Sequence, residues 1–148
     1  MAYFDEVFEA VGLEDTNLSQ PEAFAAIAVG AAAIDGKISD VEIENIVTYL
    51  RRMKLYKQYS TEQFVKLFDK VLGVLKYHGA VTLIQAASKV LSPPLRETAY
   101  AMAVDVTLSD GVLKEREDKL LRSLRQDLNL SEELAKTIIR VIEIKNRG

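Results

Sequence analysis

Apolar side chains recur every three or four positions along most of the chain, which is the spacing of an amphipathic helix. The clearest stripe comprises Phe64, Leu67, Phe68 and Val71. No segment alternates like a strand, and no linker divides the chain. We therefore expect a single all-α domain over residues 1–148, with about seven to eight helices. The pattern places them over residues 4–11, 21–34, 39–53, 61–78, 80–91, 95–108, 114–128 and 132–145.

The segment over residues 21–34 differs from the others because it is apolar nearly all round. A helix of this kind is expected in the centre of a fold. Ala28, Gly30 and Ala31 are small, so a neighbouring helix could approach closely at this point. His78–Gly79 interrupts the apolar pattern farther along. Suitable N-caps are Ser39, either Ser60 or Thr61, and Ser131.

One motif occurs twice. "DGKISDVE" begins at Asp35 and "DGVLKERE" begins at Asp110, a spacing of 110 − 35 = 75 residues, which aligns residues 26–42 with 101–117. Such an internal repeat predicts two pseudo-symmetric halves. In each copy the glycine supplies the positive φ that ends a helix, and Ile38 or Leu113 is expected to point into the core. The identical pairs are Ala26/Ala101, Ala28/Ala103, Val29/Val104, Asp35/Asp110, Gly36/Gly111 and Glu42/Glu117.

The repeated turns are rich in carboxylates, which are the ligands that calcium and magnesium prefer. With Gly36 at position 6 of an EF-hand loop, Asp35 and Glu42 fall on ligand positions 5 and 12. Positions 1 and 3 are then Ala31 and Ala33, which offer no side-chain oxygen. The second copy fails in the same way, so a high-affinity EF-hand is not expected.

Helix capping is an equal alternative for these acids. Ser39 and Glu42 have the spacing of a capping box, and acids in the first turn favour the helix dipole. The matching cap position in the second copy is Lys114. Glu117 is therefore predicted to lack a capping-box role.

Asp105 stands between Val104 and Val106 on a segment that otherwise looks buried. A buried carboxylate is costly unless it is paired or bound to a metal. Its counterpart in the first copy is Gly30. One hypothesis places Asp105 beside the gap left by Gly30, pointing at the two turns. The other places it on a solvent-facing stripe with Arg96, Thr98 or Ser109.

The Ala-rich segment leading into "AIDGKISDVE", followed later by "AVDVTLSDGVLKERE", resembles the TerB-like tellurite-resistance family over residues 21–128. The resemblance implies an all-helical domain of two related halves, a role in tellurite resistance and stress response, and no catalytic activity. It also implies a divalent cation, calcium before magnesium. The first half has no acid at Gly30, so two symmetric sites are not implied. The matching candidate ligands are Asp35, Asp40, Glu42, Asp105, Asp110, Glu115 and Glu117.

Composition narrows the remaining classes of function. The formal charge of −3, from 19 basic and 22 acidic side chains, gives no support to nucleic-acid binding. With no cysteine and one histidine, His78, thiolate sites are excluded and zinc sites or a Ser–His–Asp triad are not supported. No organic cofactor is expected. The start lacks a signal-peptide pattern and no apolar run reaches about 20 residues, so a cytoplasmic protein without a transmembrane segment is expected.

Three functional hypotheses follow. The first is a non-enzymatic, TerB-like stress-response domain whose acidic surface binds a divalent cation. The alternative is a helical protein-interaction module with no metal site, and a metal-dependent hydrolase is third. Other proteins are the expected partners, although the sequence specifies neither their identity nor the oligomeric state. The basic, aromatic stretch over residues 49–59 could meet an acidic partner or a phosphate surface, or could simply be a helix end and loop.

Overall fold

A computed structural model of the chain describes residues 17–109 and 113–147. Within these ranges it contains α-helices, one short 3-10 helix and no strand, which confirms the predicted all-α fold. The helix predicted over residues 4–11 lies outside the described residues. The elements are α2 (Gln20–Ala32), α3 (Asp40–Leu50), η1 (Lys54–Tyr56), α4 (Thr61–Val90), α5 (Pro93–Thr107), α6 (Glu115–Asp127) and α7 (Glu132–Lys145).

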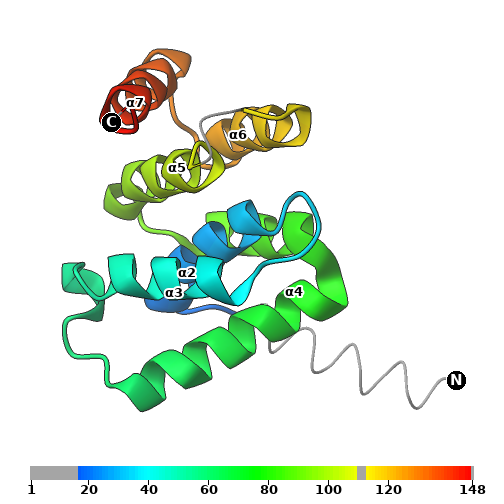
Figure 1. Cartoon of the computed structure of the whole chain (residues 1–148), viewed down its shortest axis with the longest axis vertical. Coiled ribbons are helices and arrows are strands. Elements are labelled where there is room, and N and C mark those ends of the chain that lie inside the picture. Colours follow the sequence, from blue (N-terminus) through cyan, green and yellow to red (C-terminus); the bar gives the residue numbers. More distant parts are fainter. Residues whose placement is uncertain (1–16, 110–112, 148) are drawn as a thin grey trace, which may run out of the picture.

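Helix α2 forms the centre of the fold, as its apolar sequence predicts. Every residue from Ala23 to Ala31 is buried, because α4, α5 and α3 all pack against this helix (Figure 1). Its many alanines keep the helix thin, so its neighbours can come close on several sides. Burial of apolar surface around α2 is the main stabilising contribution that the fold can offer.

Helix α4 is interrupted at Gly79, where φ is 85° and ψ is 167°. A positive φ favours glycine, which explains why the break falls at this residue. The sequence predicted an interruption at His78–Gly79, and the structure confirms it. The total of seven to eight helices stays a prediction, since residues 1–16 are not described.

Serine is the N-cap of five described helices, and four of these serines form a side-chain cap. Ser19, Ser39, Ser60 and Ser131 each accept a hydrogen bond at their Oγ from a backbone N–H in the first turn. The caps predicted at residues 39 and 131 are therefore confirmed, and of the two candidates for α4 the cap is Ser60 and not Thr61. The sequence thus defines these helix starts locally, through side-chain to backbone hydrogen bonds.

The basic, aromatic stretch contains a helix end, a loop and part of the core. Helix α3 ends at Leu50 rather than at the expected Met53, and η1 follows. Tyr56 is buried against Phe24 and Phe64, and its hydroxyl donates a hydrogen bond to the Pro21 carbonyl at 2.6 Å. The main role of Tyr56 is therefore packing.

Helix α5 connects the two ends of the molecule. It packs on α2 through one side and on α6 and α7 through another, so that α7 lies far from the start of α4 (Figure 1). The Gln20 side chain joins α2 to the connection between α4 and α5, because its Oε1 accepts from Ser92 N at 2.9 Å and its Nε2 donates to the Val90 carbonyl. None of the described helices has the length and apolarity needed to cross a membrane.

Candidate functional site

The two repeated turns have matching helix ends. Helix α2 has Ala33 as its C-cap and helix α5 has Leu108, and the next N-caps are Ser39 and Lys114. The differences are 108 − 33 = 75 and 114 − 39 = 75, which equal the spacing of the sequence repeat. The end of one helix and the start of the next therefore repeat at the same spacing as the sequence motif. The two pseudo-symmetric halves stay a prediction. Gly36 has the expected positive φ, 137°.

The apolar residue of each turn behaves differently. Ile38 packs partly buried against the core, as predicted. Leu113 is 38% exposed, so the prediction that it would point into the core is wrong. Leu113 therefore contributes less apolar contact than Ile38 does.

Both repeated glutamates cap a helix. In α3, Ser39 N donates to Glu42 Oε1 at 3.0 Å and Glu42 N donates to Ser39 Oγ at 3.1 Å, which confirms the predicted capping box. In α6, Lys114 N donates to Glu117 Oε1 at 3.0 Å. The prediction that Glu117 lacks this role is wrong, because the glutamate half of the box needs only the backbone N–H of the cap residue. A lysine ammonium has no acceptor, so the other half is missing.

The two turns meet at one pocket of about 230 Å³. Asp35 and Glu42 reach it from the first repeat, and Glu117 reaches it from the second. Glu117 is only 8% exposed, which is unusual for a glutamate. Thr107 and Ser109 add hydroxyl groups to the lining. Acids that are far apart in the sequence are therefore brought to one place.

The oxygens of this pocket suit a hard cation in kind, since calcium and magnesium take carboxylate, hydroxyl and water oxygens. Each capping glutamate commits Oε1 to a backbone N–H. Within residues 17–109 and 113–147, however, no three His, Asp or Glu side chains form a ready metal cluster. Asp110, a candidate ligand, lies outside the described residues.

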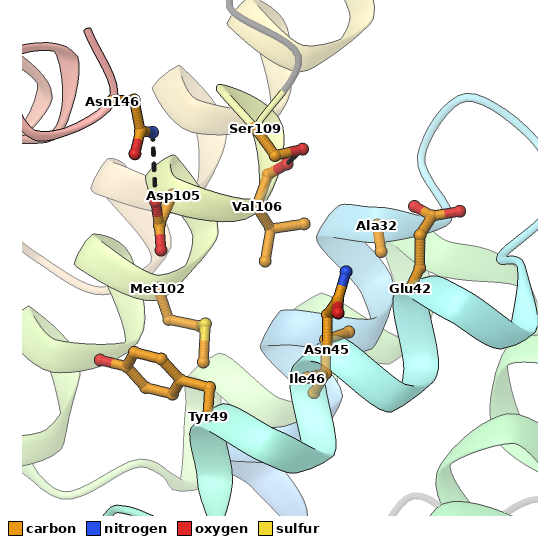
Figure 2. A pocket seen from close by; sticks show the side chains of 10 residues that line it. All are labelled: Ala32, Glu42, Asn45, Ile46, Tyr49, Met102, Asp105, Val106, Ser109 and Asn146. Carbon is orange, nitrogen blue, oxygen red and sulfur yellow. Dashed lines mark hydrogen bonds between the residues drawn. The ribbon is translucent and has the colours of Figure 1, made fainter. Parts of the chain in front are cut away.

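Asp105 does not lie beside Gly30, where one hypothesis from the sequence placed it. Its Oδ1 accepts from Asn146 Nδ2 at 3.2 Å, just past the end of α7 (Figure 2). The same oxygen accepts from Nζ of Lys145, the last residue of α7, at 3.3 Å. The space beside Gly30 is occupied by Ile84 of α4. The idea that Asp105 fills that gap is therefore wrong, and its clearest role is to hold the end of α7.

The remaining candidate ligands lie on the surface. Asp40 is exposed in the first turn of α3. The Glu115 side chain is 85% exposed and lies 3.5 Å from Lys119 Nζ, one turn along α6. Neither residue lines the pocket between the turns. Of the seven acids predicted as ligands, the structure brings together Asp35, Glu42 and Glu117.

The sequence model described as "Tellurite resistance protein TerB" matches residues 21–139, which is most of the chain. The chain belongs to the TerB family. The match extends past residue 128, where the sequence resemblance was expected to end. No curated protein and no solved structure matches this TerB-family chain.

Sequence reasoning missed the two cations that line the TerB turn pocket, Lys37 and Lys114. Lys114 lines the pocket together with the acids, and its Nζ lies 3.6 Å from Asp35 Oδ2. The signal was present in the repeat, since a cation replaces Ser39 at a helix N-terminus, where the dipole disfavours positive charge. The contact itself joins residues 114 − 35 = 79 positions apart and could not be seen in the sequence.

A second pocket of the TerB domain, of about 250 Å³, opens between α3, α5 and the end of α7 (Figure 2). Met102, Val106 and Ile46 supply apolar lining. Glu42, Asp105 and polar groups of Asn45, Asn146, Ser109 and Tyr49 are also part of the lining. Glu42 lines both pockets, so the two are neighbours along α3.

Proposed function

We propose that this TerB-family chain is a non-enzymatic tellurite-resistance or stress-response protein whose turn pocket binds a divalent cation, calcium before magnesium. The observation that carries the proposal is the meeting of acids from both repeats, Asp35, Glu42 and Glu117, at one pocket. Bringing like charges together is unfavourable, so such a cluster is best stabilised by a positive partner. A cytoplasmic location is part of the same proposal.

The three carboxylates would hold the ion, with Asp110 as a further candidate from the second turn. The cation would supply positive charge that joins the two turns. The chain's own residues would fix the carboxylates, because the backbone N–H groups of Ser39 and Lys114 each hold one glutamate oxygen. Cation binding would thus act on the starts of α3 and α6 together.

The proposal that the chain is not an enzyme rests on its residue types. It has no cysteine and a single histidine, His78, which does not line the turn pocket. Carboxylates that are committed to helix capping are poorly placed to move as general bases. Binding is therefore the simplest activity for this pocket.

Calorimetric titration of calcium into the metal-free protein tests the proposal, with the double variant Glu42→Gln/Glu117→Gln beside it. Glutamine can still accept the capping hydrogen bond, so the fold should be retained while the negative charge is lost. Glu115→Gln is the matched control, because it removes an acid from the same helix outside the pocket. Melting temperatures of all three proteins verify folding.

Saturable heat for the natural chain and for Glu115→Gln, weakened at least about tenfold in the double variant, would support the site; a tenfold change corresponds to about 1.4 kcal/mol. No heat with the natural chain, or equal heat with the double variant, would overturn it. Repeating the titration with magnesium establishes the order of the two ions.

A protein-interaction module is the second candidate function. The pocket between α3, α5 and α7 favours it, because two acids, Glu42 and Asp105, line it together with apolar side chains (Figure 2). A basic peptide side chain with an apolar stem fits that chemistry. Binding of a fluorescent oligolysine peptide that fades at high salt and ignores calcium would favour this function over the first.

A further inference from the structure

A third pocket, of about 440 Å³, opens between α5, α6 and α7, at the end of the molecule far from the start of α4 (Figure 1). Its volume is in the range of small-molecule sites. None of the described residues lines both this pocket and the turn pocket. We call it the Tyr100 pocket, and its lining includes Tyr100, Leu121, Arg125, Ala135, Lys136 and Ile139.

The Tyr100 hydroxyl forms no hydrogen bond with any residue in 17–109 or 113–147, although Tyr100 is only 2% exposed. Buried tyrosine hydroxyls usually have a partner, as Tyr56 has in the Pro21 carbonyl. No side-chain oxygen or nitrogen of the described residues is both shut off from solvent and unpaired. The Tyr100 hydroxyl therefore opens onto the pocket that the residue lines, and a partner is expected there.

Arg125 brings positive charge close to this hydroxyl. Burial raises the pKa of Tyr100, and the Arg125 guanidinium partly offsets that effect. The Arg125 side chain is 23% exposed; its Nη1 donates to the Leu130 carbonyl at 2.9 Å, and its Nη2 lies 3.9 Å from Glu132 Oε1, too far for a hydrogen bond. Most of the guanidinium donors thus have no acceptor among the described residues.

The other charges around the pocket leave a positive excess. The lining holds the cations Arg122, Arg125 and Lys136 and the acids Asp118 and Glu132. Arg122 Nε pairs with Asp118 Oδ2 at 3.0 Å, so these two charges largely cancel. The Glu132 side chain is 76% exposed and only partly balances Arg125. Lys136 is exposed and forms no ion pair with another described residue. The pocket therefore favours an anion over a cation.

We propose that the Tyr100 pocket binds a small organic acid, whose carboxylate accepts hydrogen bonds from the Tyr100 hydroxyl and the Arg125 guanidinium. A carboxylate matches the forked donors of a guanidinium. The apolar body of the acid packs against Leu121 and Ile139. Glu132 competes with the ligand for Arg125. The site is independent of the turn pocket and of the cation proposed for it.

NMR titration of the natural chain with hexanoate tests the proposal, because a fragment of this size binds weakly and needs a method suited to low affinity. Hexylamine is the control probe, since it has a similar apolar chain and a positive head. A tetrapeptide that ends in leucine, beside its C-terminally amidated form, presents a carboxylate from the end of a protein. Amide shifts that saturate in α5, α6 and α7 locate the binding.

Four single variants identify the groups that hold the acid. Tyr100→Phe should weaken hexanoate binding about threefold to tenfold with little change in melting temperature, because it removes only an unpaired hydroxyl. Tyr49→Phe is its control, since Tyr49 lies outside this pocket. Lys136→Gln should weaken binding about twofold, whereas Arg140→Gln, on the same helix but outside the pocket, should not. Glu132→Gln, in contrast, should tighten binding.

Saturable hexanoate binding at the Tyr100 pocket, absent with hexylamine and weakened in Tyr100→Phe, would support the site. No binding of hexanoate, equal binding of hexylamine, or equal affinity in Tyr100→Phe would overturn it. Binding of the acidic peptide alone would also overturn the small acid and assign the carboxylate to the end of a partner protein. If Tyr100→Phe fails to fold, the comparison of Lys136→Gln with Arg140→Gln decides, and equal affinities would overturn the site.

Discussion

Ile84 of α4 occupies the space that a side chain at Gly30 of α2 would need. A Cβ atom built on Gly30 would lie 2.5 Å from Ile84 Cγ1 and 2.9 Å from its Cδ1, well inside van der Waals contact. The close approach of the two helices therefore depends on the absence of a side chain at this point. Since α2 is the centre of the fold, the contact influences every helix that packs on it.

Gly30→Ala is expected to destabilise the protein by about 1–3 kcal/mol, because the added methyl group overpacks a filled interface. Gly73→Ala is the matched control: that glycine lies in α4 with nothing within 4 Å of its Cβ position. The control should be neutral or stabilising by up to about 1 kcal/mol through helix propensity. Urea denaturation measures both.

A double-mutant cycle with Ile84→Ala identifies the cause. If the clash with Ile84 is responsible, Gly30→Ala should cost much less in the Ile84→Ala background. An equal cost in both backgrounds would mean that the alanine disturbs something other than this contact.

Glu117 should stabilise α6 through its cap, independently of any ion. Glu117→Ala removes the acceptor for Lys114 N and is expected to lower the free energy of unfolding by about 1 kcal/mol in the absence of divalent ions. Glu117→Gln keeps the acceptor and should cost much less. Equal losses for the two variants in chelator-containing buffer would contradict the capping role.

Asp105 is expected to matter for α7 and not for calcium. Asp105→Ala removes the acceptor shared by Lys145 and Asn146, so amide exchange at the end of α7 should accelerate, while global stability falls by less than about 1 kcal/mol. Glu143→Ala, on an exposed part of the same helix, is the control. Loss of calcium binding in Asp105→Asn would move the cation site to the neighbouring pocket.

The carboxyl group of Glu22 should make the stability of the fold depend on pH in the acidic range. Burial raises the pKa of its carboxyl, but hydrogen bonds from Ser19 and the Lys70 ammonium at 3.0 Å outweigh burial and lower the pKa below the ordinary 4.5. Its stabilising contribution is therefore present above pH 4.5 and is lost as the pH falls through the lowered pKa.

The natural chain should thus lose stability more steeply below pH 4.5 than Glu22→Gln does. Lys70→Met should raise the pKa of Glu22, which NMR titration of the side chain can follow. An unchanged pKa in Lys70→Met would show that the backbone and side chain of Ser19, and not Lys70, lower the pKa of Glu22.

Features encoded by neighbouring residues were predictable from the sequence. Serine caps, the break at Gly79 and the central position of α2 follow from residue type and apolar spacing. The end of α3 was harder, because the choice between one more turn of helix and η1 depends on Tyr56 entering the aromatic core. Tertiary contact decided that boundary, and no local signal could.

The candidate site shows the same division. The repeat identified Asp35, Glu42 and Glu117 by spacing, and the structure brings these three to one pocket. Asp105 was misplaced because its partner Lys145 lies 40 residues later, on a helix whose docking the sequence does not specify. Ile84 beside Gly30 and Lys114 beside Asp35 are also long-range contacts, which depend on how helices pack.

The connections α2–α3 and α5–α6 have the same length, which has a consequence for insertions and deletions. From the last residue of α2 to the first of α3 is 40 − 32 = 8 positions, and from α5 to α6 it is 115 − 107 = 8. Surface connections usually accept insertions and deletions at little cost. Here the Asp35–Lys114 contact joins the two connections, so we expect one added residue in either connection to weaken it. The two connections should therefore tolerate changes of residue type far better than changes of length.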